Sequence, residues 1–219
     1  MKIYNYFFFF IFILSLFSAC KTTKSYYYDV NGDEMTEEAF LEKSRQKEYY
    51  LWVRMIEDSI REVHLKKPRF KILQIDHDIF LNQVENLTGK KFSNTLTFLI
   101  LYKYRDDECI NKNKVNKIYL NNRRSYYKYF MEKKENENLI LLVFYENGIL
   151  VYNKNKKEKF FYKDKDNYFR QNIFKTPALC GSWAIVKPEG NILIQNGESP
   201  LSLALKLMEP KYWSKIFPR

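Results

Sequence analysis

The sequence predicts an α/β protein built on one mixed β-sheet, preceded by a helical extension and an N-terminal export signal. Three patterns lead to this prediction. The run Ile3–Phe17 is almost entirely apolar, residues 36–90 carry apolar positions at helical spacing, and residues 95–208 alternate strand-like runs with helical segments. With 219 residues, the chain is long enough for one sizeable core and an appendage.

The first 19 residues have the three-part layout of a secretory signal peptide. Lys2 gives a positive start, the apolar run follows, and Ser18-Ala19 precede Cys20. This ending resembles the lipobox of bacterial lipoproteins, with Phe17 in the place where leucine is usual. The resemblance implies cleavage before Cys20 and lipid attachment to its thiol. An uncleaved membrane anchor is the alternative, since a run of this length just spans a thin bilayer.

Residues 20–35 are expected to form the lipidated cysteine and a tether, and residues 36–90 a helical extension. Thr36 is a good N-cap, and the acidic residues after it favour the positive end of a helix. The apolar positions between Phe40 and Ile56 predict one long helix or two shorter ones.

The second half of this extension has clear boundaries. Pro68 ends the preceding segment, and residues 70–75 alternate like a strand. Asp76 is expected to cap a helix over about 77–88, and Gly89 suits the end of that helix.

Residues 91–219 predict the mixed sheet. Two β-rich apolar runs are typical of strands covered on both faces, and a helix with a basic outer face separates them. Strand–helix–strand implies a parallel pair, whereas a Pro-then-Gly turn joins two antiparallel strands. The expected elements are strands 96–102 and 139–145 around helix 118–134, short strands 149–152 and 159–162, a short helix 166–174, a hairpin of strands 183–186 and 191–195, and a last helix capped by Ser199.

This order of elements resembles the thioredoxin fold. The stretch CGSWAIVKPEGNILIQNG strengthens the resemblance, because Gly190 matches the turn glycine and Gly197 the glycine after the second strand. The resemblance covers residues 91–219 and implies a redox loop after the first strand, where Cys109 lies. The domain is degenerate: Cys109 is followed by Ile-Asn-Lys rather than by a second cysteine of a Cys-x-x-Cys motif. The proline expected before the third strand is also replaced, by Ser182, and Pro177 is too far upstream.

Two cysteines remain once Cys20 carries lipid. Cys109 and Cys180 would lie in an oxidising compartment, where two thiols tend to join. Sequence alone does not bring their Cα atoms within bonding distance. The thioredoxin resemblance does, because its redox loop faces the loop before the third strand. The pair is then a structural staple or an exchangeable disulfide. Neighbouring charges have opposite effects on a thiol pKa, namely Arg105, Lys112 and Lys114 against Asp106, Asp107 and Glu108.

The charge balance indicates anionic partners. Lys and Arg number 37 against 26 Asp and Glu, which attracts anionic surfaces, although codon bias of an AT-rich genome also explains abundant lysine. Export argues against nucleic acid. Arg123-Arg124, Tyr126-Tyr127 and Lys133-Lys134 form a basic aromatic helix face, either solvated or in contact with anionic lipid.

No metal or cofactor site is predicted. Residues 29–34 superficially match a calcium loop, but its sixth position is not Gly and its twelfth, Phe40, is not Glu. Asp76-His77-Asp78 is interpreted as a helix cap, because adjacent residues of an extended chain point to opposite sides. The acidic pair at 57–58 and the acidic triplet at 106–108 are interpreted as solvated surface. The sequence offers neither a Ser/His/Asp arrangement nor a Gly-rich phosphate loop.

The sequence therefore predicts a lipid-anchored extracytoplasmic protein with a non-catalytic binding or scaffolding role at the envelope membrane. The alternative is a thiol–disulfide exchange protein that uses Cys109 and Cys180 as candidate catalytic residues. A third class, an envelope hydrolase, has no residue to recommend it. Lys21, in place of the Asp that retains many lipoproteins in the inner membrane, predicts the outer membrane, facing the periplasm.

Overall fold

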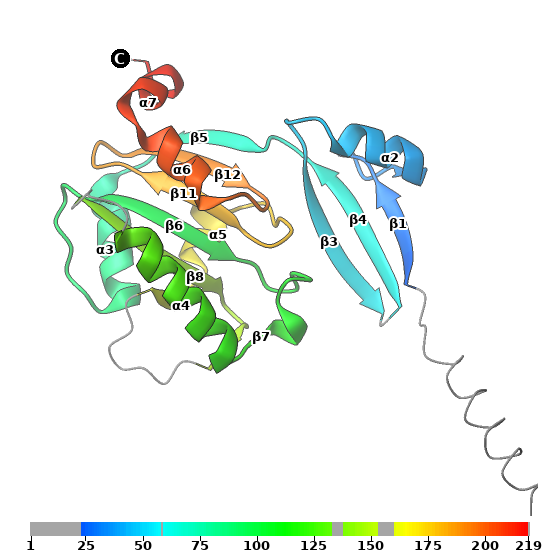
Figure 1. Cartoon of the computed structure of the whole chain (residues 1–219), viewed down its shortest axis with the longest axis horizontal. Helices are drawn as coiled ribbons and strands as arrows, with labels where there is room; N and C mark the ends of the chain where they lie inside the picture. The colour runs from blue at the N-terminus through cyan, green and yellow to red at the C-terminus, as the bar shows by residue number, and fades with distance from the viewer. Residues whose placement is uncertain (1–22, 58, 133–137, 153–159, 219) are drawn as a thin grey trace, which may run out of the picture.

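The computed structural model describes residues 23–57, 59–132, 138–152 and 160–218, and these form two mixed β-sheets side by side (Figure 1). The predicted signal segment, Cys20 and Lys133-Lys134 lie outside the described residues. Within the described part of the chain, no helix combines the length and the apolarity needed to cross a membrane.

The smaller sheet belongs to the N-terminal part of the chain. Its four strands have the order β2-β1-β4-β3, with β1 and β4 parallel and the other neighbours antiparallel. Helix α2 packs on it through Phe40, in a small core with Val53, Val63 and Leu65. The elements are β1 (Lys24–Tyr28), β2 (Glu34–Met35), α2 (Glu37–Ser44), β3 (Tyr50–Glu57) and β4 (Ile60–Lys66).

The helices predicted within residues 36–90 are therefore wrong between α2 and Pro68, where the chain forms β3 and β4, whereas the strand expected at residues 70–75 is confirmed. The sequence was misleading here because β3 faces two cores. Tyr50 is buried among residues of the large sheet, whereas Val53 is buried in the core of the small one. Apolar residues on both faces of a strand give a three-residue spacing that imitates a helix.

The larger sheet has six strands in the order β10-β8-β6-β11-β12-β5. The strands β10, β8 and β6 are mutually parallel, whereas β11, β12 and β5 each run antiparallel to the strand before them. The strands are β5 (Phe70–Gln74), β6 (Thr97–Lys103), β8 (Leu139–Glu146), β10 (Phe161–Asp164), β11 (Ser182–Val186) and β12 (Asn191–Asn196).

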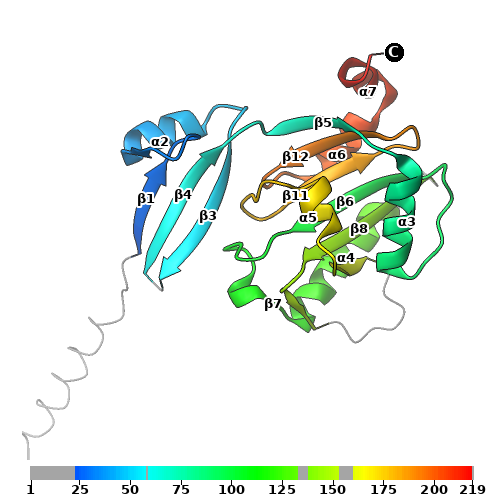
Figure 2. The same cartoon turned by 180° about the vertical axis from the view of Figure 1, so that it is seen from behind.

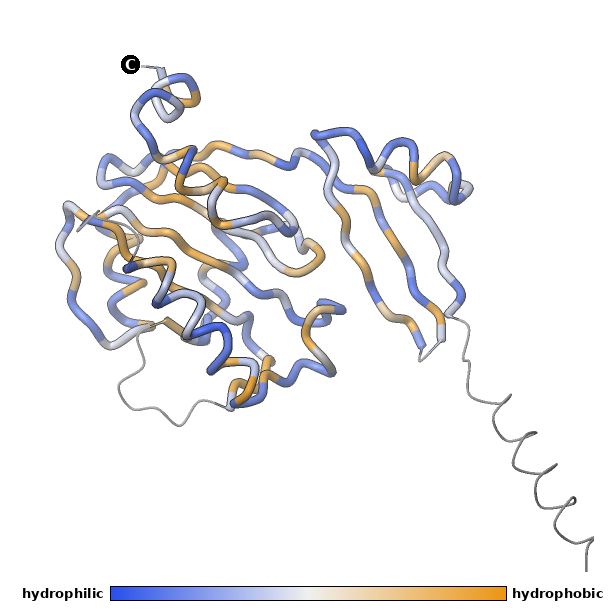
Figure 3. Tube along the Cα trace, in the orientation of Figure 1, coloured by the Kyte–Doolittle hydropathy of each residue, from blue (hydrophilic) through white to orange (hydrophobic). Residues whose placement is uncertain are grey.

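Helices cover both faces of the large sheet and make a three-layer unit. Helices α4 and α6 lie on one face, and α3 and α5 lie on the other (Figures 1 and 2). The central strands are the most hydrophobic part of the trace, as a strand buried on both faces requires (Figure 3). The helices are α3 (His77–Thr88), α4 (Lys117–Glu132), α5 (Tyr168–Asn172), α6 (Leu201–Met208) and α7 (Pro210–Ile216). The unit also contains a short 3-10 helix, η1 (Asn111–Asn113), and a two-stranded sheet of β7 (Lys114–Val115) and β9 (Leu150–Val151).

The division of the chain at residue 90 does not match the sheets. Strand β5 pairs with β12 along its whole length, and Phe80 and Val84 of α3 are fully buried in the core of the large unit. Residues 70–88 therefore belong with the predicted mixed-sheet domain rather than with an N-terminal extension.

Most predicted boundaries in the large unit are confirmed. Asp76 caps α3 by accepting hydrogen bonds from two backbone amides, and Gly89 ends that helix in a left-handed conformation. The parallel pair β6–β8 around α4 and the hairpin β11–β12 are present. Ser199 does not cap α6, however: its hydroxyl accepts a hydrogen bond from Trp183 and donates one to Gln195, and Pro200 is the N-cap instead.

Candidate functional site

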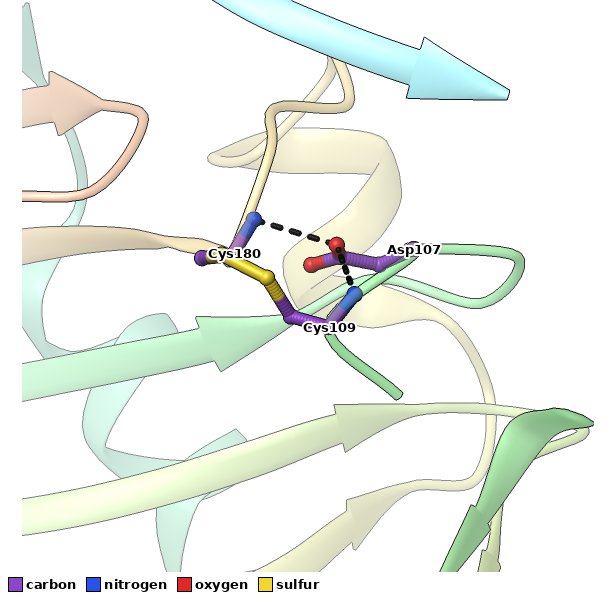
Figure 4. A group of neighbouring side chains, drawn as sticks. All are labelled: Asp107, Cys109 and Cys180. Atoms are coloured by element: carbon purple, nitrogen blue, oxygen red, sulfur yellow. Dashed lines mark hydrogen bonds between the residues drawn. A yellow bond between two sulfur atoms is a disulfide. The ribbon is translucent and has the colours of Figure 1, made fainter. Parts of the chain in front are cut away.

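The structure joins Cys109 and Cys180 by a disulfide, with their Cα atoms 5.1 Å apart (Figure 4). Sheet topology explains how residues so distant in sequence meet. Strand β6 ends beside the beginning of its antiparallel neighbour β11, where Tyr102 pairs with Ser182. The loop that leaves β6 and the loop that enters β11 therefore share one end of the sheet, and each contributes one cysteine.

Asp107 holds these two loops together. Its Oδ1 atom accepts a hydrogen bond from the backbone N–H of Cys109 and another from the N–H of Cys180, both at 3.0 Å (Figure 4). The Asp107 side chain is buried, and its second oxygen, Oδ2, has no hydrogen-bond partner among the described residues. The interpretation of residues 106–108 as solvated surface is thus wrong for Asp107, because its carboxylate binds backbone groups brought together only by the fold.

Lys103 and Gly181 complete the frame around Cys180. The ammonium of Lys103, the last residue of β6, donates a hydrogen bond to the Cys180 carbonyl oxygen. Gly181 has a φ of +93°, and a Cβ atom there would collide with the backbone oxygen of Tyr102. This conformation and this close approach explain why glycine follows the cysteine.

Burial pushes the two titratable groups of the site toward their neutral forms. Loss of water raises the pKa of the Asp107 carboxyl, although the two N–H donors and the charge of Lys103 oppose that rise. Burial likewise lowers the pKa of the Lys103 ammonium, against the attraction of Asp107. Perturbed groups of this kind beside a reactive bond are typical of functional sites, although structural networks also produce them.

The two cysteines differ in their exposure. Cys109 is exposed, whereas Cys180 is only partly accessible. A pocket of about 460 Å³ opens beside Cys180 between α4 and the ends of β6, β11 and β12, with Lys103, Arg123 and Glu198 among its charged residues. A second pocket, of about 390 Å³, has Asp107 in its lining and lies between the Cys109 loop and the end of β3.

The small sheet contacts both loops of the site. Leu51 of β3 accepts a backbone hydrogen bond from Leu179 at 2.7 Å, next to Cys180. Arg61 of β4 forms an ion pair with Glu108, next to Cys109, at 3.5 Å. Because both loops are tied to the small sheet as well as to each other, the N-terminal sheet forms one wall of the site.

Other residues singled out in the sequence lie elsewhere. Asp76 and His77 belong to the start of α3, and Asp29 closes a turn by accepting three backbone hydrogen bonds. Arg123 lines the pocket beside Cys180, whereas Arg124 lies over the ring of Phe161. Sequence reasoning missed Lys103, for which the only signal was a lysine directly after the predicted apolar strand 96–102.

One group of potential metal ligands occurs among the described residues. The ligand atoms of Asp107, Cys109 and Cys180 all lie within 4.8 Å of one another. In this structure the two sulfurs are bonded to each other, so neither is a thiolate, and the carboxylate is the one group of the three in its usual metal-binding form.

The fold and the site together define a mixed α/β protein with a partly exposed disulfide at one end of its main sheet. No protein-family model, curated protein or solved structure matches the chain.

Proposed function

We propose that the chain is an extracytoplasmic lipoprotein whose Cys109–Cys180 disulfide exchanges with thiols of partner proteins. The observation that carries the proposal is the unequal exposure of Cys109 and Cys180. The buried carboxylate of Asp107 and the ammonium of Lys103 form hydrogen bonds with the backbone of the less exposed one, Cys180. A disulfide that served only to staple two loops would need neither an accessible side nor this polar frame.

The sheet order supports a degenerate thioredoxin-like domain. Strands β8, β6, β11 and β12 are neighbours in that order, with β6 and β8 parallel around α4 and β11 and β12 forming a hairpin. A thioredoxin-like domain requires this arrangement, and it places the redox loop against the loop before the third strand. Strands β5 and β10 are additions at the two sides.

The exchange step follows from the exposure. A thiolate of the partner attacks the Cys109 sulfur, the Cys109–Cys180 bond breaks, and Cys180 leaves as a thiolate. The product is a mixed disulfide between Cys109 and the partner. Lys103 donates a hydrogen bond to the Cys180 carbonyl oxygen, and when it is protonated its charge would favour a thiolate on the same residue.

Cys180 supplies the resolving thiol that the missing Cys-x-x-Cys motif would otherwise provide. Its thiolate attacks the Cys109 sulfur of the mixed disulfide, releases the partner thiol and restores the original bond. The two cysteines therefore form a complete exchange pair even though 71 positions separate them.

A redox titration tests the proposal. The chain 21–219, which contains every described residue, is equilibrated in glutathione buffers, quenched with acid, alkylated and weighed as the intact protein. We expect two labels to appear at potentials of about −120 to −270 mV, the range of working oxidoreductases, with the circular dichroism of the folded protein retained. A pair that stays oxidised below about −300 mV would be a structural staple.

Two single variants form a matched pair for the same assay. With Cys180→Ser, exposed Cys109 is expected to hold glutathione as a stable mixed disulfide. With Cys109→Ser, the less accessible Cys180 should react more slowly. Equal rates in the two variants would contradict the proposed direction of attack.

A second candidate, the non-catalytic binding or scaffolding role, is favoured by the pocket beside Cys180. Its mixed lining, with Lys103, Arg123, Glu198 and the exposed Tyr126, suits a polar segment of a partner protein. In that role the Cys109→Ser/Cys180→Ser double variant would still complement a deletion strain, whereas an exchange protein would lose its function.

The proposed location rests on the N-terminal sequence. A lipid on Cys20 would anchor the chain in the envelope, in the outer membrane facing the periplasm. The basic face of α4 then offers an anionic lipid surface an exposed cation at Arg123. Cosedimentation with phosphatidylglycerol vesicles, weakened by salt and by Arg123→Glu, would support that contact.

A further inference from the structure

We infer that the reduced protein binds one Zn²⁺ ion through the thiolates of Cys109 and Cys180 and the carboxylate of Asp107. The inference extends the proposed function, because it requires a disulfide that opens, but it does not require exchange with a partner. It starts from the three ligand atoms, which lie within 4.8 Å of one another.

Asp107 is already arranged as a ligand. Its Oδ1 atom is held by the N–H groups of Cys109 and Cys180, and these two bonds fix the orientation of the carboxylate. The buried Oδ2 atom is without a hydrogen-bond partner among the described residues. A buried acceptor without a partner costs free energy, and a cation beside it would remove that cost.

The sulfur positions are compatible with zinc once the bond is open. Zn–S bonds of about 2.3 Å in a tetrahedron place two sulfurs roughly 3.8 Å apart. Cα atoms 5.1 Å apart allow this separation, because each cysteine can rotate about its Cα–Cβ bond and Cys109 is exposed. The oxidised protein cannot form this site, since each sulfur is then bonded to the other and is no longer a thiolate.

The chemistry of the ligand set selects the ion. Two thiolates favour Zn²⁺ or Cu⁺ over hard cations, and a carboxylate as third ligand favours Zn²⁺ over Cu⁺. Two thiolates and one carboxylate carry three negative charges, which Zn²⁺ and the adjacent Lys103 ammonium together balance. Three protein ligands leave a fourth position open, and a pocket with Asp107 in its lining lies next to this group of ligands.

The balance of the reaction is simple. A dithiol reduces the disulfide and becomes a cyclic disulfide itself, so two electrons and two protons pass to Cys109 and Cys180. Zn²⁺ then replaces the protons of the two thiols, and each thiol that binds releases one proton. Metal binding therefore holds the site in its reduced state.

The test uses the chain 21–219 reduced with a phosphine, desalted without oxygen and titrated with Co²⁺ and then Zn²⁺. We expect one equivalent of Co²⁺ to produce a thiolate-to-cobalt charge-transfer band, Zn²⁺ to abolish it, and Zn²⁺ to protect both thiols from alkylation. The oxidised chain should give no band. Absence of the band in the reduced chain, an equal response of the oxidised chain, or unfolding on reduction would each overturn the inference.

A matched pair of variants tests the carboxylate. Asp107→Asn keeps an oxygen that can accept the two backbone bonds, and we expect it to weaken Co²⁺ binding about tenfold or more. Glu108→Gln changes the adjacent acid, which pairs with Arg61 instead, and should alter binding by less than roughly twofold. If Asp107→Asn folds and binds as tightly as the wild type, the carboxylate is not a ligand and the assignment fails.

The outcome separates the two proposals. If the Cys109–Cys180 disulfide resists glutathione but the protein binds Co²⁺ after phosphine reduction, the exchange function is refuted and the metal site is supported. If the disulfide exchanges readily with glutathione but the reduced protein binds no metal, the metal site is refuted and the exchange function is supported.

Discussion

Removal of the disulfide is expected to lower stability by less than its loop length alone suggests. Cys109 and Cys180 are 71 residues apart, and closing such a loop in the unfolded chain stabilises the native state by about 4 kcal/mol. Cys180, however, has a φ of +59°, a left-handed conformation that costs a residue other than glycine about 1–2 kcal/mol. If opening the bond lets Cys180 leave this conformation, despite the hydrogen bonds from Lys103 and to Asp107, the expected net loss is about 2–3 kcal/mol.

This magnitude is measurable in two independent ways. Urea unfolding of the oxidised chain and of the Cys109→Ser/Cys180→Ser variant gives the difference in free energy of unfolding directly. For a chain of this size, the midpoint of thermal unfolding should fall by about 5–10 °C. The same free energy should make the reduction potential of the folded pair about 40–60 mV more negative than that of the unfolded pair.

Two results would refute the reasoning. A loss of about 4 kcal/mol or more, with a potential about 90 mV more negative, would mean that Cys180 releases no strain and that the bond is a staple. Equal stability of the two forms would mean that the cross-link does not restrict the unfolded chain. In either case the exchange proposal would lose its energetic basis.

Three further predictions concern single positions. Gly181→Ala should destabilise the protein by more than Gly89→Ala, because both glycines have positive φ but, of the two, only Gly181 lies against a backbone oxygen. Gly89→Ala is expected to cost about 1 kcal/mol, and equal losses of the two variants in urea unfolding would contradict the close approach at Gly181. Burial raises the pKa of fully buried Asp164 above its unfolded value, so the folded state binds more protons, and stability should fall as pH rises from the unfolded pKa through the folded one. Asp164→Asn should flatten this part of the stability–pH profile, and an unchanged profile would contradict the role of Asp164. Cys20→Ala should abolish metabolic labelling with palmitate and leave the precursor uncleaved, whereas labelled Cys20→Ala protein would exclude Cys20 as the lipid site.

Local sequence signals predicted local structure well in the large unit. Asp76 and Gly89 bound α3 as expected, because a cap depends on the few residues next to it. The expectation failed for β3, where the apolar pattern reflects two different cores rather than one helix face. It also failed for Ser199, whose hydroxyl donates a hydrogen bond to Gln195, four positions earlier, and accepts one from Trp183, which the hairpin brings close.

The sequence by itself determined the central strands of the large sheet, from whose ends the two cysteine loops leave. The apolar runs specify which segments become central strands, since a strand covered on both faces must be hydrophobic throughout. The count of cysteines left Cys109 and Cys180 as the candidate pair, and the resemblance to the thioredoxin fold implied that their two loops would face each other.

Only the tertiary structure decided what surrounds that bond. Asp107 is one acid among three consecutive acids in the sequence, and nothing local distinguishes it from its neighbours. It becomes the buried centre of the site because the N–H groups of Cys109 and Cys180 converge on its carboxylate, while Glu108 turns outward to Arg61. Such convergence depends on contacts between segments far apart in the chain, and a sequence pattern records only the segments.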